Sequence, residues 1–388
     1  MRILMVLTYY HPHWTGLTAH AQRLAEELVR SGHRVTVLTA QFRKDLDLQE
    51  QHNGVEIVRL PTVGRVSRGM LMPSFPRAAW RLIREHDVVQ VHTPMLEAAL
   101  VVWLANRAGK KTLVTHHGDL VMPAGLFDQF VEHTVTALMR PSLRWAPAIS
   151  SYSRDYAEHS IYLRPFLHKM SFIYPPIEIP QPVPEEVAAW RRELGLEGHP
   201  VVGFAGRFVE EKGFDFLLQA IPAIQAQVPG TKFAFAGERN VVYDNFYARW
   251  EHLVERHKED IVFLGLLTDR QKLANFYAMC DLFALPSRTD CFAIVQVEAM
   301  LCGTPVVASD IPGARVPVRE TGMGRLVRPR DPEALATGIV EVLQNPLRYR
   351  RTPQQVREVF STERTVAQYV EVFERLCERG PKGGDVRR

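Results

Sequence analysis

The sequence predicts an α/β protein with two parallel sheets, one in each half of the chain. Short apolar stretches alternate with stretches of helical length, which is the pattern of parallel strands covered on both faces by helices. The pattern runs through the first half, stops at a proline-rich segment and then starts again. With 388 residues, the chain is long for one domain and suits two.

The first half opens with an apolar strand over 2–10, then a polar loop and an amphipathic helix over 17–33. The helix carries apolar side chains three and four residues apart, and the tripeptide "SGH" ends it. Further strands follow, mostly separated by segments of helical length. They are expected at 34–40, 55–60, 88–92, 111–117, 146–150 and 169–174.

A linker is expected over 174–186, because five prolines in 13 residues disfavour regular structure. It separates an N-terminal domain, 1–173, from a C-terminal domain, 187–361. The last helical stretch, 362–380, comes after the second sheet is complete, so we expect it to pack back on the N-terminal domain.

Strands of the second half are expected at 200–207, 232–237, 261–265, 281–287, 304–309 and 324–329, and a helix at 331–346. Ligands of parallel sheets bind at the carboxyl ends of the strands. Two such domains facing each other would therefore place a ligand site in a cleft between them.

Composition excludes several classes of protein. A net charge of +4 is too small to argue for nucleic-acid binding. The four cysteines form no C-x-x-C pair, so we expect buried thiols in a reducing compartment rather than zinc ligands or disulfides. No apolar stretch approaches the ~18–20 residues that span a bilayer. The expected location is the cytoplasm.

Two cations lie in the loop after the strand at 200–207. Arg207 can bind a diphosphate through two N–H groups at once, and Lys212 can attract it as a point charge. The alternative is a solvated loop in which Glu210 and Glu211 neutralise both cations, and spacing alone does not decide between the two.

The segment "DCFAIVQVE" carries an acid at each end. Eight helical positions turn by about 800°, so Asp290 and Glu298 cannot form one tight pair on a helix face. We instead expect a loop carrying Asp290 and a helix that begins near Phe292. The amides of Phe292, Ala293 and Ile294 would then lie at a helix N-terminus, where anions bind. Taken singly, each acid could be an ordinary helix residue.

The compound pattern "GRFVEEKGFDFLLQA", "FLGLL" and "DLFALPSRTDCFAIVQVEAMLCGTPVVAS" resembles the C-terminal half of glycosyltransferase family 4. The "TG" loop, "SGHRVTVLT" and "LVTHHGD" resemble its N-terminal half. The likeness covers roughly 1–345 and implies the GT-B fold, in which two Rossmann-like domains face each other across a cleft. It also implies a retaining enzyme that uses a nucleotide-sugar.

The resemblance assigns roles to individual positions in the second half. Arg207 and Lys212 would bind the donor diphosphate, and Glu298 would bind the ribose hydroxyls. Asp290 stands where the family has a glutamate facing the donor sugar, so its carboxylate is one methylene shorter. Backbone groups near Leu266 and Leu267 would meet the nucleobase.

In the first half, the resemblance places Gly16 close to phosphate or sugar, with a simple tight turn as the alternative. It places His117 near the donor sugar's hydroxyls, while His92 is a weaker candidate. His11 and His13 have no third ligand at useful spacing, so no metal site is expected.

A basic and apolar stretch lies between Glu56 and Glu85, where no other acid occurs. Such a surface suits anionic lipid headgroups and a lipid-linked acceptor, and a solvated helix face with a mobile loop is the alternative. Its arginines are Arg59, Arg65, Arg68, Arg77, Arg81 and Arg84, and its apolar residues are Met70, Leu71, Met72, Phe75 and Trp80. The stretch therefore allows peripheral contact with the inner face of a membrane, and the alternative stays open.

The expected reaction moves a sugar from a nucleotide diphosphate to a hydroxyl of a glycan, a lipid or a small molecule, with retained anomeric configuration. Arg207 and Lys212 would take the place of a metal, so no cofactor is expected. Two alternatives stay open. One is a GT-B phosphorylase or epimerase, and the other is a nucleotide-sugar-binding protein without transferase activity.

Overall fold

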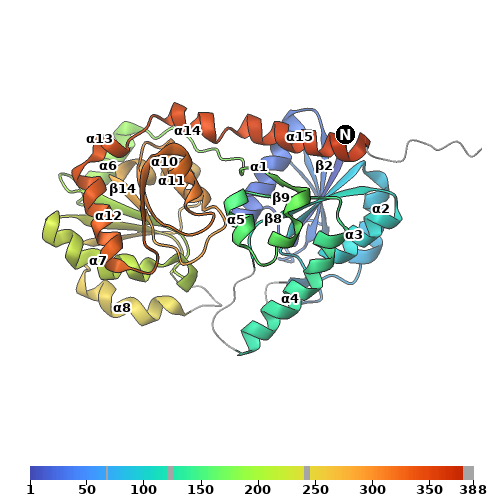
Figure 1. The fold of residues 1–388 in the computed structure, drawn as a ribbon, viewed down its shortest axis with the longest axis horizontal. Coiled ribbons are helices and arrows are strands. Elements are labelled where there is room, and N and C mark those ends of the chain that lie inside the picture. Colours follow the sequence, from blue (N-terminus) through green and yellow to red (C-terminus); the bar gives the residue numbers. More distant parts are fainter. Residues whose placement is uncertain (67–68, 120–125, 240–244, 379–388) are drawn as a thin grey trace, which may run out of the picture. The chain divides into compact units, whose positions relative to one another are not determined.

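The computed structural model describes all residues except 67–68, 120–125, 240–244 and 379–388 (Figure 1). It divides into two compact units. Unit 1 comprises Met1–Pro176 together with the chain from Thr362, and unit 2 comprises Ile177–Ser361. Within the described residues, no helix is both long and apolar enough to cross a membrane.

Unit 1 is built on an eight-stranded sheet in the order β10-β9-β8-β7-β1-β2-β4-β3. Its strands are β1 (Arg2–Val6), β2 (Arg34–Ala40), β3 (Gln49–His52), β4 (Val55–Leu60), β7 (Val88–Thr93), β8 (Lys111–His116), β9 (Ala148–Ser151) and β10 (Met170–Phe172). All pairs are parallel except β3 with β4. A separate hairpin joins β5 (Gly64–Val66) to β6 (Gly69–Leu71).

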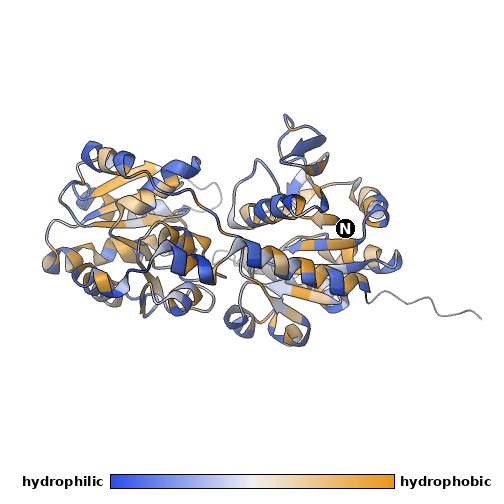
Figure 2. Ribbon diagram, turned by 90° about the horizontal axis from the view of Figure 1, so that it is seen from above, coloured by the Kyte–Doolittle hydropathy of each residue, from blue (hydrophilic) through white to orange (hydrophobic). Residues whose placement is uncertain are grey.

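Helices cover this sheet, and their apolar sides face it while their polar sides face outward (Figure 2). They are α1 (Gly16–Arg30), α2 (Phe75–Glu85), α3 (Ala98–Arg107), α4 (Leu126–Trp145), α5 (Arg154–His159) and α15 (Thr362–Glu378). Helix α1 begins after Thr15, whose hydroxyl accepts from the amide of Thr18. Helix α15 buries Tyr369 and Phe373 in the same core as Leu24 of α1.

Unit 2 is built on a six-stranded, fully parallel sheet in the order β13-β12-β11-β14-β15-β16. Its strands are β11 (Val201–Ala205), β12 (Lys232–Ala236), β13 (Ile261–Gly265), β14 (Leu282–Leu285), β15 (Val306–Ser309) and β16 (Gly324–Val327). The helices are α6 (Pro184–Glu193), α7 (Phe214–Gln227), α8 (Phe246–Arg256), α9 (Arg270–Met279), α10 (Ile294–Leu301), α11 (Val316–Thr321), α12 (Pro332–Gln344), α13 (Pro346–Tyr349) and α14 (Pro353–Val359). Buried phenylalanines, among them Phe204, Phe214 and Phe235, fill its core.

The predicted parallel strands are present in both units, with ends that differ by a few residues. Strand β3 and the β5–β6 hairpin were not predicted, because they are short and carry few apolar residues. Strand β3 pairs with β4 in an antiparallel manner, and the hairpin is separate from the main sheet. Helix α6 begins at Pro184, inside the segment predicted as linker, since proline is well tolerated in the first turn of a helix.

Candidate active site

In unit 2 the strand order reverses at β11. The chain runs from β11 to β12 and β13 on one side, and then returns to place β14, β15 and β16 on the other. Strands β11 and β14 are neighbours, and the loops that leave their carboxyl ends therefore run in opposite directions along the edge of the sheet. Open α/β sheets bind their ligands at such a point. These two loops carry Arg207, Lys212 and Asp290.

Lys212 and Asp290 join the two loops. The Lys212 ammonium donates to Oδ2 of Asp290 at 2.6 Å, and the two side chains are only 23% and 8% exposed. Burial alone would lower the pKa of Lys212, but the negative charges of Asp290 and Glu211 outweigh it and hold the pKa above its usual value. Lys212 is therefore charged at neutral pH. Lys212, which the resemblance assigns to phosphate, and Asp290, which it assigns to the sugar, are therefore in direct contact.

Arg207 pairs with Glu211, as in the solvated-loop alternative. Its Nη2 donates to Oε1 of Glu211 at 2.6 Å, and the guanidinium side chain is 38% exposed. Exposed ion pairs are worth about 0–1 kcal/mol. A bound diphosphate could compete with Glu211 for the guanidinium of Arg207. Glu210, in contrast, contributes its backbone carbonyl to Arg288.

Arg288 holds the two loops together and was missed in the sequence. Its guanidinium forms two hydrogen bonds of 2.7 Å with the carboxylate of Asp215 in the first turn of α7, and it lies over the ring of Phe216. Its backbone amide donates to the carbonyl of Glu211 at 2.8 Å. Asp215 is 1% exposed. Two-point pairing of this kind fixes geometry as well as charge, so Arg288 positions the loop that carries Lys212.

Gly213 lies between Lys212 and α7 in the left-handed region, with φ of 67°. A Cβ there would lie 2.0 Å from the carbonyl oxygen of Pro286 in the other loop. Only glycine allows this approach of the two loops.

We expect Gly213→Ala to destabilise the protein clearly more than Gly195→Ala, as measured by urea unfolding. Gly195 has the same φ of 67°, but its Cβ would meet nothing within 4 Å. The control therefore reports only the left-handed strain, about 1–2 kcal/mol. Equal losses of stability in the two variants would show that the contact with Pro286 is unimportant.

Helix α10 begins at Ile294, two residues later than predicted. Ala293, with φ of 57°, precedes it in the left-handed region and delays the helical turn. The amide of Ala293 donates to Oδ1 of Asp290 at 3.1 Å. Of the three amides expected to bind an anion, this one therefore serves Asp290, whose carboxylate both caps the loop and pairs with Lys212.

Glu298 lies in α10, buried to 6% exposure, and its Oε2 accepts from the hydroxyl of Tyr277 in α9 at 3.2 Å. This contact orients the carboxylate that the resemblance assigns to ribose. Leu266 is 62% exposed at the carboxyl end of β13, on the same edge of the sheet, and Leu267 follows it.

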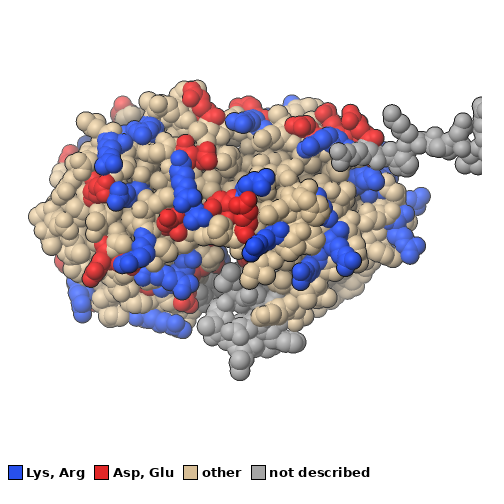
Figure 3. Space-filling model, viewed as in Figure 1, with Lys and Arg blue, Asp and Glu red and all other residues tan. Residues whose placement is uncertain are grey.

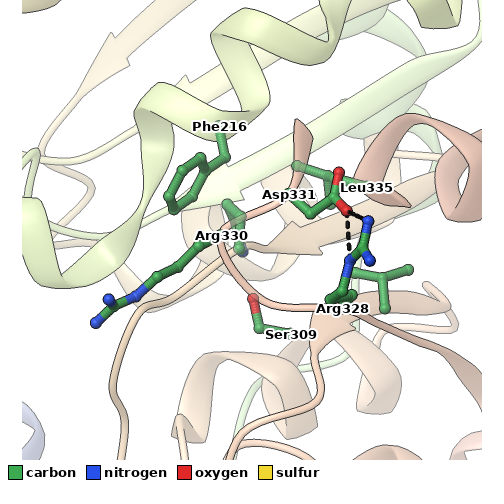
Figure 4. A pocket seen from close by; sticks show the side chains of 8 residues that line it. Phe216, Ser309, Arg328, Arg330, Asp331 and Leu335 are labelled. Carbon is green, nitrogen blue, oxygen red and sulfur yellow. Dashed lines mark hydrogen bonds and ion pairs between the residues drawn. The ribbon is translucent and has the colours of Figure 1, made fainter. Parts of the chain in front are cut away.

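A small pocket lies at the carboxyl ends of β14, β15 and β16 (Figure 4). Arg328 pairs with Asp331 beside it, while Arg330 extends away from it. Its lining residues are Phe216, Pro286, Ser309, Val327, Arg328, Arg330, Asp331 and Leu335. None of the residues assigned to the donor lines this pocket.

In unit 1, His117 follows β8 and is buried to 7% exposure. Its Nε2 lies 2.8 Å from Nδ1 of His92, and its Nδ1 lies 2.5 Å from the hydroxyl of Tyr152. Burial lowers the pKa of His92 to about 3 and that of His117 well below its usual range, so both rings are neutral at neutral pH. With both nitrogens of His117 bonded, a sugar hydroxyl would have to displace His92 or Tyr152.

Gly16 is the first residue of α1, and a Cβ there would meet nothing within 4 Å. This conformation does not itself demand glycine. Among the described residues of unit 1, two groups of side chains have the composition of a metal site: His20, His92 and His117, which are buried, and His11, Glu50 and His52, which are half-buried. Neither group was predicted, because each brings together separate parts of the chain: His20, His92 and His117 in one, and His11 with the segment 50–52 in the other.

Two family profiles match the chain in succession. The profile "Glycosyl transferase 4-like domain" matches residues 15–171, and "Glycosyl transferases group 1" matches residues 199–345. The chain belongs to glycosyltransferase family 4. As a glycosyltransferase, it is an enzyme of the class that the sequence predicted.

Curated relatives of this glycosyltransferase align over nearly their full length. One is the GDP-mannose-dependent alpha-(1-6)-phosphatidylinositol monomannoside mannosyltransferase of Mycolicibacterium smegmatis, 28% identical over 89% of this chain and 90% of that protein. Another is the phosphatidyl-myo-inositol mannosyltransferase of Mycobacterium leprae, 26% identical over 98% of this chain and 99% of that protein.

Solved structures confirm the predicted GT-B fold. Sucrose-phosphate synthase from Thermosynechococcus elongatus matches with a TM-score of 0.77 at 22% identity, over 97% of this chain and 98% of that one. HepE from Anabaena, solved in complex with UDP, matches with a TM-score of 0.77 at 21% identity, over 97% of this glycosyltransferase and 100% of HepE.

Proposed function

We propose that this glycosyltransferase moves a hexose from a nucleoside diphosphate donor to a hydroxyl of a lipid-linked acceptor, with retained anomeric configuration. The observation that supports the proposal is the contact between Lys212 and Asp290 where the strand order reverses, because the family resemblance assigns the first to phosphate and the second to the sugar. The names of two relatives, which act on phosphatidylinositol-based acceptors, support a GDP-mannose donor and an inositol lipid acceptor.

In the proposed reaction, the bond between the anomeric carbon and the diphosphate oxygen breaks as the acceptor oxygen bonds to the same face of that carbon. The acceptor's proton passes to the departing diphosphate. Negative charge grows on the diphosphate, and Arg207 and Lys212 stabilise it there. Asp290 accepts hydrogen bonds from the sugar hydroxyls, and Glu298 accepts them from the ribose.

No metal takes part in this reaction on our proposal, because the two cations supply the positive charge that Mg²⁺ supplies to phosphate groups in many other enzymes. The direct test is an assay with GDP-mannose, UDP-glucose and a phosphatidylinositol acceptor, with and without added Mg²⁺. We expect a mannosylated lipid with the α configuration of the donor by NMR, at a rate that Mg²⁺ does not raise. Donor hydrolysis without transfer, or inversion at the anomeric carbon, would refute the proposal.

We also propose that α2 lies against anionic lipid headgroups. Arg77, Trp80, Arg81 and Arg84 are exposed and recur at helical spacing, so they share one face of α2. The guanidinium of Arg84 lies 5.8 Å from the ring centroid of Trp80. On the visible face of unit 1, blue side chains gather around α2, and most red ones lie over α15 (Figure 3). Such a face suits a membrane interface.

Four residues of the predicted basic stretch do not belong to this surface, and a fifth lies outside the described residues. Arg59 is 2% exposed, because it forms an ion pair of 2.6 Å with Glu50 and donates to the carbonyls of His11 and Asp47. Met70, Met72 and Phe75 are buried in the protein. Arg68 is the residue outside the described part of the chain.

The triple variant R77E/R81E/R84E should lose binding to vesicles that contain phosphatidylinositol, as measured by co-sedimentation. Each basic residue near an anionic surface contributes about 1 kcal/mol, so the loss should be large and should diminish with salt. The matched control is R249E/R256E/K272E, which reverses three exposed cations in unit 2. Equal loss in both variants would point to net charge alone, and no loss in either would exclude this surface.

A further inference from the structure

We propose that Tyr277 gives the donor site its preference for a ribonucleotide over a 2′-deoxyribonucleotide. On this proposal the hydroxyl of Tyr277 holds the carboxylate of Glu298 in the orientation that accepts hydrogen bonds from the ribose. The inference rests on the proposed function, in which Glu298 binds the ribose hydroxyls. Tyr277 acts through Glu298 and does not itself touch the nucleotide, so it is a positioning residue.

The contact between these two side chains is buried. The hydroxyl of Tyr277, in α9, donates to Oε2 of Glu298, in α10, at 3.2 Å. Tyr277 is fully buried, and Glu298 is 6% exposed. A hydrogen bond to an ionised carboxylate is stronger than one between neutral groups, and surroundings of low dielectric constant strengthen it further. The contact therefore restricts the rotation of the Glu298 side chain.

The Tyr277 side chain is itself held in place by the core of unit 2. Its backbone carbonyl accepts from the hydroxyl of Thr304 at 2.7 Å. Its ring meets the ring of Phe283 edge to face, with centroids 5.5 Å apart and an interplanar angle of 77°. Phe283 lies in β14, Thr304 lies just before β15, and both are buried. Side chains that bind ligands keep their geometry when buried neighbours of this kind fix them.

The orientation of the Glu298 carboxylate matters because a ribose presents two neighbouring hydroxyls. A carboxylate can accept from both, since its two oxygens offer about four acceptor sites. The hydroxyl of Tyr277 occupies one of these sites and thereby sets the plane of the carboxylate. Dinucleotide-binding proteins also place an acid on the ribose 2′-hydroxyl. A 2′-deoxyribose would leave this mostly buried carboxylate short of one donor, which costs more than the loss of an exposed hydrogen bond.

The alternative is a purely structural role, in which Tyr277 packs α9 against α10 without influencing the choice of nucleotide. Tyr349→Phe is the matched control. Tyr349, in α13, is 6% exposed and also donates to a glutamate carboxylate, that of Glu341 in α12. Glu341 pairs with Arg325 at 3.2 Å, and Arg325 lies at the amino end of β16. This second pair therefore lies away from the carboxyl edge of the sheet, where the donor is expected to bind.

Calorimetric titration of GDP and 2′-deoxy-GDP into the wild type, Tyr277→Phe and Tyr349→Phe tests the proposal, with UDP and 2′-deoxy-UDP in parallel. We expect the wild type to bind the ribonucleotide at least about tenfold more tightly, which is the usual value of a hydrogen bond to a charged group. Tyr277→Phe should reduce this preference about threefold or more by weakening ribonucleotide binding, whereas Tyr349→Phe should keep it. An undiminished preference in Tyr277→Phe, or equal losses for both nucleotides, would overturn the proposal.

A double-mutant cycle with Glu298→Ala tests whether Tyr277 acts through Glu298. If it does, Tyr277→Phe should not change the preference further once Glu298 is alanine. Additive effects of the two substitutions would overturn the proposal. The ratio of two affinities measured on one sample does not depend on the fraction of unfolded chain, so loss of stability in a variant does not imitate the expected result.

The wild type distinguishes failure of this inference from failure of the proposed function. Equal binding of ribonucleotide and deoxyribonucleotide by the wild type would refute the ribose role of Glu298 and the inference with it, without touching sugar transfer. No binding of any nucleoside diphosphate would refute the proposed function as well. A preference that the wild type and Tyr277→Phe share to the same extent would refute the inference alone.

Discussion

Lys212→Ala should lower kcat/KM for the donor on the order of 10²–10³-fold, which is the usual cost of removing one group that stabilises charge in a transition state. Lys212 is charged, mostly buried and at the point where the strand order of unit 2 reverses. The variant loses the charge that offsets the departing diphosphate. Initial rates measured at several donor concentrations, together with circular dichroism of the folded chain, provide the readout.

Lys232→Ala is the matched control for this prediction. Lys232 also pairs with an aspartate, Asp260, at 2.8 Å, and its side chain is 20% exposed. It begins β12 and therefore lies at the amino edge of the same sheet, away from the loops that carry Lys212 and Asp290. This variant should turn over donor at the wild-type rate. Near-normal turnover by Lys212→Ala would remove the phosphate clamp from the mechanism.

Asp290 should tolerate glutamate but not asparagine. Asp290→Glu keeps the charge beside Lys212 and restores the longer acid typical of the family, so turnover should stay within about tenfold of the wild type or rise. Asp290→Asn keeps an oxygen that can accept from the amide of Ala293, but it loses the ion pair. Its turnover should fall by far more, on the order of 10²-fold.

The Asp290→Asn variant should also change the pH dependence of the reaction. Burial lowers the pKa of Lys212, and Asp290 is the first of the groups that raise it again. Without that carboxylate, Lys212 loses its proton at lower pH, so the alkaline limb of the kcat/KM profile should shift toward neutrality. An unchanged alkaline limb, or a collapse of Asp290→Glu, would show that Asp290 does not act through Lys212.

The parallel strands of both units could be predicted because each is a short apolar stretch bounded by polar loops. The glycosyltransferase class could also be predicted, because its residues fall in three compact motifs. Strand β3 could not be predicted, since its sequence, "QEQH", has no apolar pattern. The strand forms because it pairs with β4. The start of α10 was placed too early because Ala293 adopts a left-handed backbone, which the local sequence does not indicate for an alanine.

Contacts between distant residues were the hardest part of the site to predict. The Lys212–Asp290 pair spans 78 positions, and Tyr277 meets Glu298 across 21. The bond between Arg288 and Asp215 and the three-histidine cluster likewise depend on strand order, which no local pattern encodes. The burial of Arg59 was also mispredicted. It was counted with the exposed basic residues of its stretch, but it is buried and forms an ion pair with Glu50.

The central claim is that the loops after β11 and β14 bind the diphosphate of a nucleotide donor. Calorimetric titration of GDP and GMP into the wild type and into Lys212→Ala tests it most directly. We expect GDP to bind the wild type at least about tenfold more tightly than GMP, a difference of ~1.4 kcal/mol, and this preference should vanish in the variant. Equal affinities of GDP and GMP for the wild type, with UDP and UMP also equal, would contradict the claim.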